Sequence, residues 1–216
     1  MVLLQEYDFI NQFWSQIFIT PGGPSARWGA SGGIDTRTLP IQDPILPGPN
    51  NTFYLAGGFN GTGLDPLSDV WRLNISGTLS SNLPNNVNGT WDHFAIGNLP
   101  GLTNQSGTVI GQDIVVSGGC NVTTDMGTSC ASRDSFVLDV NERSAISPPS
   151  CPAPRVGAVL VPNENTFSSA FSSQLFLLLG TFNTSLWQDN NGLVQGEVVS
   201  ICSREMNVYQ SCLGYT

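Results

Sequence analysis

The chain has 216 residues and a formal net charge of −9, and all seven of its basic residues are arginine. Nucleic acids and anionic membrane surfaces are bound through clustered cations, which this sequence lacks, so neither is an expected partner. Its longest apolar block, Leu175–Leu179, is far too short to span a bilayer. The 24 glycines and 14 prolines exclude long helices, whereas a hydrophobic content of 40% suffices for a core. These features predict an all-β fold.

The expected strands are short and are separated by turns rich in glycine and proline. A β segment at Arg27–Ser31 follows the phrase Pro24-Ser-Ala-Arg27. An apolar run, Phe53–Gly58, then ends in two glycines, and a strand at Asp69–Leu73 comes after a polar loop. Short strands in this arrangement indicate antiparallel sheets.

The same order of elements returns twice along the chain. The segments of the second and third copies are 107–110, 114–119 and 134–138, then 157–161, 175–180 and 196–201. The last glycines of the three apolar runs, Gly58, Gly119 and Gly180, lie 61 residues apart in both intervals. An asparagine-containing turn follows each run. A fixed period of this kind indicates a repeat architecture in which each unit packs on its neighbours.

The order of proline, arginine, apolar run, glycine pair, loop and tryptophan resembles the kelch repeat. Tyr7-Asp8-Phe-Ile-Asn-Gln-Phe-Trp14 is similar to the phrase that closes a kelch blade. The resemblance implies a propeller of six or seven four-stranded blades around a channel, and it is closest to the secreted kelch proteins of fungi. It implies structural roles for the residues that carry it: Tyr7, Asp8, Trp14, Arg27, Gly57, Gly58, Trp71, Trp91, Gly118, Gly119, Arg155 and Gly180. The tryptophans are expected to be anchors between blades.

The resemblance predicts about three four-stranded antiparallel blades of a partial propeller, plus two strands of a preceding blade. The expected division is 1–19 for those two strands, 20–98, 99–149 and 150–201 for the three blades, and 202–216 for a divergent tail. The repeat is imperfect, because the second copy has Ile146 in place of a closing tryptophan. After Ile201 neither the turn nor the tryptophan of a last strand is present. The tail is therefore either a diverged last strand or sequence foreign to the repeat. The second is expected, which leaves the third blade incomplete.

Several features point to an oxidising, extracellular compartment. Asn-x-Ser/Thr acceptor sites for glycans begin at Asn50, Asn60, Asn74, Asn88, Asn104, Asn121 and Asn183. The five cysteines form no metal-binding pairs and lie in loops, and Cys120–Cys130 is the preferred disulfide. The first residues lack the basic start and long apolar run of a leader, which predicts an internal piece of a longer chain.

The sequence offers no catalytic, cofactor or metal site. Kelch propellers share a superfamily with copper radical enzymes of the galactose-oxidase type, whose metal, as that family implies, takes two histidines and two tyrosines. This chain has one histidine, His93, and no nucleophile elbow of the form Gly-x-Ser-x-Gly. His93 is expected to be a half-exposed strand residue. An oxidase remains the alternative only if its ligands lie outside this chain.

The expected function is therefore non-catalytic recognition of a protein or a glycan. Propellers present loops on their faces, and binding residues are concentrated on such loops. The loops at 34–50, 60–68, 76–89 and 121–134 are long and polar. An intracellular kelch adaptor is disfavoured by the glycan acceptor sites and by the loop cysteines. The other blades of the full propeller are the remaining expected partner.

Overall fold

The structure is a computed structural model in which strands, turns and loops account for all described residues. No helix occurs in this part of the chain, and so none there has the length and apolar character to cross a membrane. The described residues are 4–8, 12–34, 50–63, 65–78, 86–110, 113–121, 132, 134–147, 156–162, 174–178, 180, 196–201 and 210–214. The predicted all-β class is confirmed.

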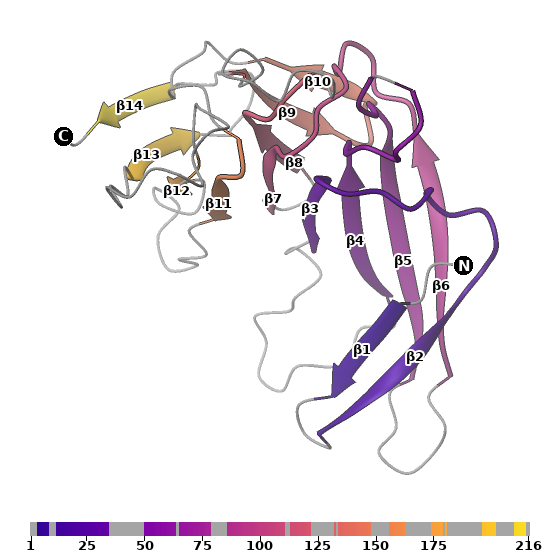
Figure 1. The fold of residues 1–216 in the computed structure, drawn as a ribbon. Helices are drawn as coiled ribbons and strands as arrows, with labels where there is room; N and C mark the ends of the chain where they lie inside the picture. Colours follow the sequence, from indigo (N-terminus) through magenta and orange to yellow (C-terminus); the bar gives the residue numbers. More distant parts are fainter. Residues whose placement is uncertain are drawn as a thin grey trace, which may run out of the picture.

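Within the described residues, fourteen strands form three sheets, whose arrangement Figure 1 shows. The first sheet contains β1 (Leu4–Asp8), β2 (Phe13–Ile19), β3 (Ser31–Ile34), β4 (Asn50–Ala56), β5 (Val70–Thr78) and β6 (Asn86–Phe94) in the order β1-β2-β6-β5-β4-β3. The second contains β7 (Ser106–Ile110), β8 (Asp113–Ser117), β9 (Ser135–Asp139) and β10 (Ser144–Ile146). The third contains β11 (Val159–Pro162), β12 (Gln174–Leu178), β13 (Gly196–Ile201) and β14 (Gln210–Gly214). Strands β3–β6, β7–β10 and β11–β14 are four-stranded antiparallel meanders, here called blades one, two and three.

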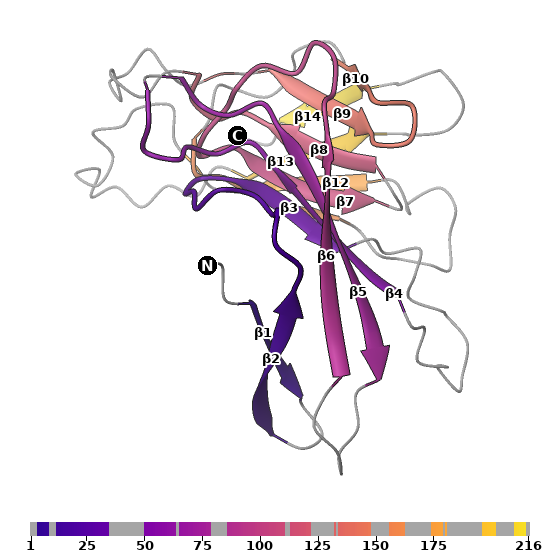
Figure 2. The ribbon, with the colours of Figure 1, turned by 90° about the vertical axis from the view of Figure 1, so that its right-hand side faces the viewer.

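The three blades follow one another along an arc. Their first strands β3, β7 and β11 lie on its concave side, and β7 contacts both β3 and β11 (Figure 1). The view from the side shows the sheets stacked behind one another rather than lying in one plane (Figure 2). This is the arrangement of a partial β-propeller.

Because side chains alternate between the two faces of each strand, a sheet can present an apolar face to the blade on either side of it. In β8, Ile114 and Val116 join the core shared with blade one, whereas Val115 joins the core shared with blade three. The first core contains Tyr54, Ala56, Val70, Phe94, Ile96, Val109, Ile114, Val116, Leu138 and Val140. The second contains Val115, Val137, Leu160, Leu175 and Leu177. Because successive side chains of a strand point to opposite faces, one four-stranded sheet is buried on both sides only between two others.

The cores between the described blades contain none of Trp14, Trp71 and Trp91, so the role of these tryptophans as anchors between blades stays a prediction. On β5, Val70 faces blade two, so its neighbour Trp71 lies on the opposite face of the sheet. Trp71 packs edge to face on Trp91 with ring centroids 6.4 Å apart. Trp14 is 64% exposed. The anchors between blades one and two are aliphatic residues with Tyr54 and Phe94 instead.

The N-terminal hairpin lies against the outer strand of blade one. β1 and β2 pair antiparallel with Tyr7 opposite Trp14, and β2 pairs parallel with β6 through Phe18 and Ile19. The backbone N–H of Thr20 extends this pairing by donating to Gly89 O at 2.9 Å. Two strands therefore occur where the sequence predicted them, and they share the sheet of blade one. Their assignment to a preceding blade stays a prediction.

The C-terminal segment completes blade three. β14 pairs with β13 from Glu197 opposite Gly214 to Ile201 opposite Gln210. The sequence favoured a segment foreign to the repeat over a diverged last strand, because the segment lacks the tryptophan that closes blade one. Backbone pairing requires no particular side chain, and so the fourth strand forms without that residue.

Successive blades are linked by backbone hydrogen bonds between residues in the left-handed region. The N–H of Asn104 donates to Gly29 O at 2.8 Å, and the N–H of Gly157 donates to Asn104 O at 2.9 Å. The φ angles of Gly29, Asn104 and Gly157 are 65°, 55° and 65°. These three residues occupy the same position of the repeat, two residues before the first strand of each blade. They are called the left-handed ladder below. Asparagine is the residue other than glycine that most readily adopts this conformation.

The effect of a substitution at Asn104 on the free energy of unfolding should therefore depend on whether the new residue tolerates positive φ, and not on the size of its side chain. Asn104→Val is expected to lower the free energy of unfolding by about 1–2 kcal/mol, because a β-branched residue is strained at positive φ. Asn104→Gly should change it by less than about 0.5 kcal/mol. Urea denaturation of the two variants measures the difference. Equal losses of stability in the two variants would show that the left-handed backbone conformation does not explain the asparagine at position 104.

Candidate binding face of blade one

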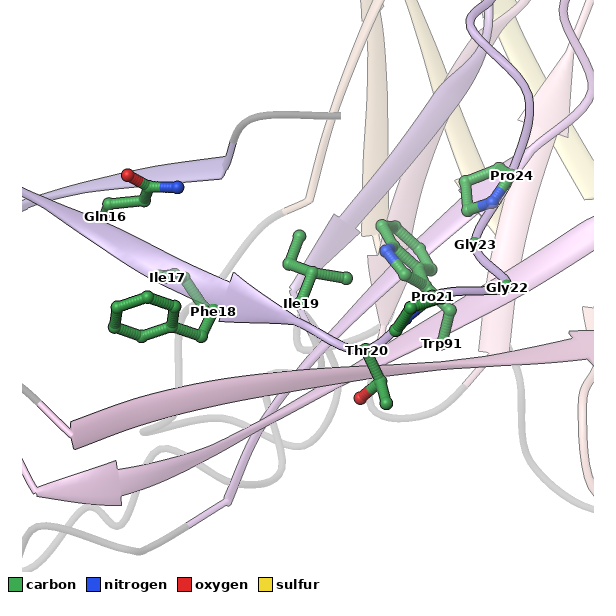
Figure 3. A pocket seen from close by; sticks show the side chains of 10 residues that line it. All are labelled: Gln16, Ile17, Phe18, Ile19, Thr20, Pro21, Gly22, Gly23, Pro24 and Trp91. Atoms are coloured by element: carbon green, nitrogen blue, oxygen red, sulfur yellow. The ribbon is translucent and has the colours of Figure 1, made fainter. Parts of the chain in front are cut away.

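A pocket of about 480 Å³ lies between β2, the segment that follows it and β6 (Figure 3). Ten residues line it: Gln16, Ile17, Phe18, Ile19, Thr20, Pro21, Gly22, Gly23, Pro24 and Trp91. None of these carries an ionisable side chain, and most of the lining is apolar. Its volume is in the range of small-ligand sites. No motif in the sequence marks this region as a site.

The local sequence explains why these residues line the pocket. Alternation on β2 buries Ile17 and leaves Phe18 63% exposed at the rim. The chain then crosses the indole of Trp91 at Gly23, where a Cβ atom would lie 2.6 Å from the ring carbon Cδ1. Only glycine permits so close an approach. The indole Nε1 of Trp91 is buried without a hydrogen-bond partner among the described residues.

Beside the pocket, Arg27 and Asp69 form a partly buried ion pair, and their network contains three residues with sequence-predicted structural roles: Arg27, Gly57 and Trp71. The Arg27 guanidinium donates to both Asp69 oxygens at 2.5 and 2.9 Å and to Gly57 O at 3.0 Å. Trp71 Nε1 donates to Asp69 at 2.6 Å. The side chains of Arg27 and Asp69 are 5% and 21% exposed. This network fixes the start of β3 to the turn after β4.

The electrostatics of Asp69 suit a structural role. Burial favours its protonated form, but the hydrogen bonds from Arg27 and Trp71, with the charges of Arg27 and His93, outweigh burial. The pKa of the Asp69 carboxyl is consequently lowered below its ordinary value of 3.8. A carboxylate whose two oxygens are held by a cation and an indole is a poor general acid or base at neutral pH.

His93 is an exposed strand residue that stacks on Trp71, with ring centroids 4.7 Å apart. Among the described residues, no group of three histidine, cysteine, aspartate or glutamate side chains is arranged to hold a metal ion. Of the other predicted residues, Cys130, Arg155 and Asn183 lie outside the described parts of the chain. Cys120 is buried and disulfide-bonded, while its pairing with Cys130 stays a prediction.

The predicted glycan acceptors differ in their surroundings. Asn60 lies on an exposed turn, and Asn88 and Asn121 are exposed. The amide nitrogen of Asn74 in β5 donates to Asp92 in β6 at 2.8 Å, and Arg72 of β5 also binds Asp92. Asn104 belongs to the left-handed ladder. Asn50 is the first residue of β4. Glycosylation of these asparagines stays a prediction.

Trp28 is an exposed aromatic residue at a position where the other blades have small residues. It pairs with Phe59 in an isolated bridge, and the two rings pack edge to face with centroids 5.6 Å apart. Thr103 and Cys120 form the corresponding bridge of blade two, and both are buried. Trp28 is 45% exposed. Comparison of the repeats could have revealed this difference from sequence.

The three stacked meanders define the chain as part of a β-propeller, and similar solved structures share this fold. One is a fungal alcohol oxidase of the AA5 family in complex with copper, with a TM-score of 0.51 and 14% identity over 80% of this chain. Another is YjhT, with a TM-score of 0.52 and 15% identity over 92%. The chain spans 31% of the oxidase and 48% of YjhT, less than half of either. No protein-family model and no curated protein matches the sequence.

Proposed function

We propose that this chain is part of a non-catalytic, extracellular kelch-type propeller that binds a protein or carbohydrate ligand. The observation that carries the proposal is the pocket beside Trp91. Its lining by the described residues offers apolar surface, an amide and a hydroxyl, but no ionisable group. Such a lining suits recognition of an uncharged ligand group and provides neither a nucleophile with a base nor an acid–base pair.

The exposed face of blade three supports the expectation of further blades. Val159, Val161 and Leu178 are 48%, 39% and 37% exposed, and they alternate with the residues that pack on blade two. By the pattern of β8, this second apolar face is the one that another blade would cover. We infer that the complete protein contains such blades.

Binding by the pocket can be tested with two exposed residues of the same strand. Phe18 lines the pocket, whereas Trp14 does not, and both are more than 60% exposed. Neutral oligosaccharide and peptide arrays would first identify a ligand of the chain. Phe18→Ser is then expected to weaken its binding at least tenfold, through loss of apolar contact, while Trp14→Ser leaves it unchanged. Equal affinities in all three proteins would reject the pocket as the binding site.

The second candidate function is an oxidase whose copper ligands lie in other parts of a longer protein. The similarity in fold to a copper-containing AA5 oxidase is the observation that favours it. Metal analysis and absorption spectroscopy of the full-length protein separate the two functions. The binding-module proposal predicts no stoichiometric copper and no radical absorbance. Copper at one equivalent with a radical band would favour the oxidase.

A further inference from the structure

The turn at Asn60 presents a glycan acceptor in a preformed geometry. The side-chain oxygen of Asn60 accepts hydrogen bonds from the backbone N–H of Thr62 at 3.0 Å and from its hydroxyl at 2.7 Å. Gly61, Thr62 and Gly63 are exposed. The acceptor amide and the hydroxyl that its recognition requires are thus already in contact on an open turn.

One residue of an aromatic pair immediately precedes this acceptor along the chain. Phe59 precedes Asn60, and its backbone exchanges two hydrogen bonds with Trp28, at 3.0 and 2.9 Å. The edge-to-face contact between the two rings holds the indole in place although Trp28 is 45% exposed. Arg27, the neighbouring cation, is neutralised by Asp69, so an uncharged group is favoured here.

The repeat shows that the fold does not need this aromatic pair. Blade two has Thr103 and Cys120 in the same bridge, and there too an acceptor asparagine, Asn121, follows directly. In blade three the residue corresponding to Trp28 is Val156, which is buried. An exposed tryptophan at this position therefore has no packing role that the other blades share.

We infer that the first N-acetylglucosamine of a glycan on Asn60 packs against the Trp28–Phe59 pair. The C–H face of a pyranose ring is apolar and weakly positive, which complements the negative face of an aromatic ring. A sugar linked to Asn60 has no translational entropy to lose, so a single stacked ring suffices for a stable contact. The inference rests on the proposed extracellular, glycosylated state of the protein. It adds a specific contact between the glycan and blade one.

The test is a cycle of variants of the full-length protein secreted from yeast behind a supplied leader, with its glycans trimmed to one N-acetylglucosamine. Occupancy at Asn60 is measured by mass spectrometry, and thermal midpoints are compared with those of Asn60→Gln. The sugar is expected to raise the midpoint by about 2–4 °C, and Trp28→Val, which copies blade three, should remove at least half of that rise. A sugar at Asn121 should give a shift that Trp28→Val leaves unchanged.

A direct measurement keeps the inference falsifiable if Trp28→Val does not fold. In the unsubstituted chain, the N-acetyl or ring protons of the Asn60 sugar should show upfield ring-current shifts in NMR spectra and NOEs to the Trp28 indole. An occupied Asn60 without these signals, or an unoccupied Asn60 beside occupied Asn88 and Asn121, would overturn the inference. Because secretion is imposed by the leader, either result is distinct from finding that natural material lacks glycans, which would reject the proposed extracellular role.

Discussion

Asp69→Ala is expected to destabilise the chain by about 3–5 kcal/mol, the typical cost of leaving a buried cation without its partner. The substitution leaves the Arg27 guanidinium, whose side chain is 5% exposed, with only Gly57 O and the short-range contacts to Ser25. It also removes the acceptor of Trp71 Nε1. Urea denaturation measures the loss. Asp65→Ala, an exposed loop substitution, is the control and should cost less than about 0.5 kcal/mol.

The same carboxylate should make stability depend on pH. Because the pKa of Asp69 is lowered in the folded state, its ionisation contributes stability above the ordinary value of 3.8, and this contribution is lost as the pH falls through the folded pKa. The stability difference between the unsubstituted chain and Asp69→Asn should therefore be constant near neutral pH and shrink below about pH 4. A difference that stays constant on acidification would contradict the lowered pKa.

Gly107→Ala should cost about 1–3 kcal/mol, because blades one and two approach each other too closely for a side chain there. A Cβ atom at Gly107 in β7 would lie 2.5 Å from Ser31 Oγ and 2.6 Å from Ser31 Cβ in β3. Gly97→Ala is the matched control, since no atom lies within 4 Å of its Cβ position. Thermal unfolding of the two variants compares them. Equal midpoints would show that β3 and β7 are not in contact.

Strands could be predicted from the sequence where the residue types within the strand itself favour a β conformation. Runs such as 114–119 combine β-branched residues with terminal glycines, and β8 occupies this segment. β14 could not be predicted, because it is held by backbone pairing to β13 and carries none of the residues that mark the repeat. The 61-residue period predicted a repeat of similar stacked units, and the resemblance to the kelch repeat then implied the partial propeller.

The candidate site was much less predictable than the fold. Its pocket depends on the parallel contact of β2 with β6, which joins residues about 70 positions apart, and no local pattern specifies such a pairing. The direction of Trp71 likewise depended on which face of β5 meets blade two. By contrast, the phrase Pro24-Ser-Ala-Arg27 predicted a structural role for Arg27, and the structure places this side chain in a hydrogen-bonded network with Asp69.

Radial stacking of the blades can be examined in solution by an NOE between two inner strands. A Cβ atom at Gly33 in β3 would lie 3.2 Å from the Cγ2 methyl carbon of Val109 in β7, so the α protons of Gly33 must be close to that methyl group. We predict a strong cross-peak between them in the folded chain. A folded, well-dispersed spectrum in which this cross-peak is missing would mean that the sheets do not meet along their first strands and that the chain is not part of a propeller.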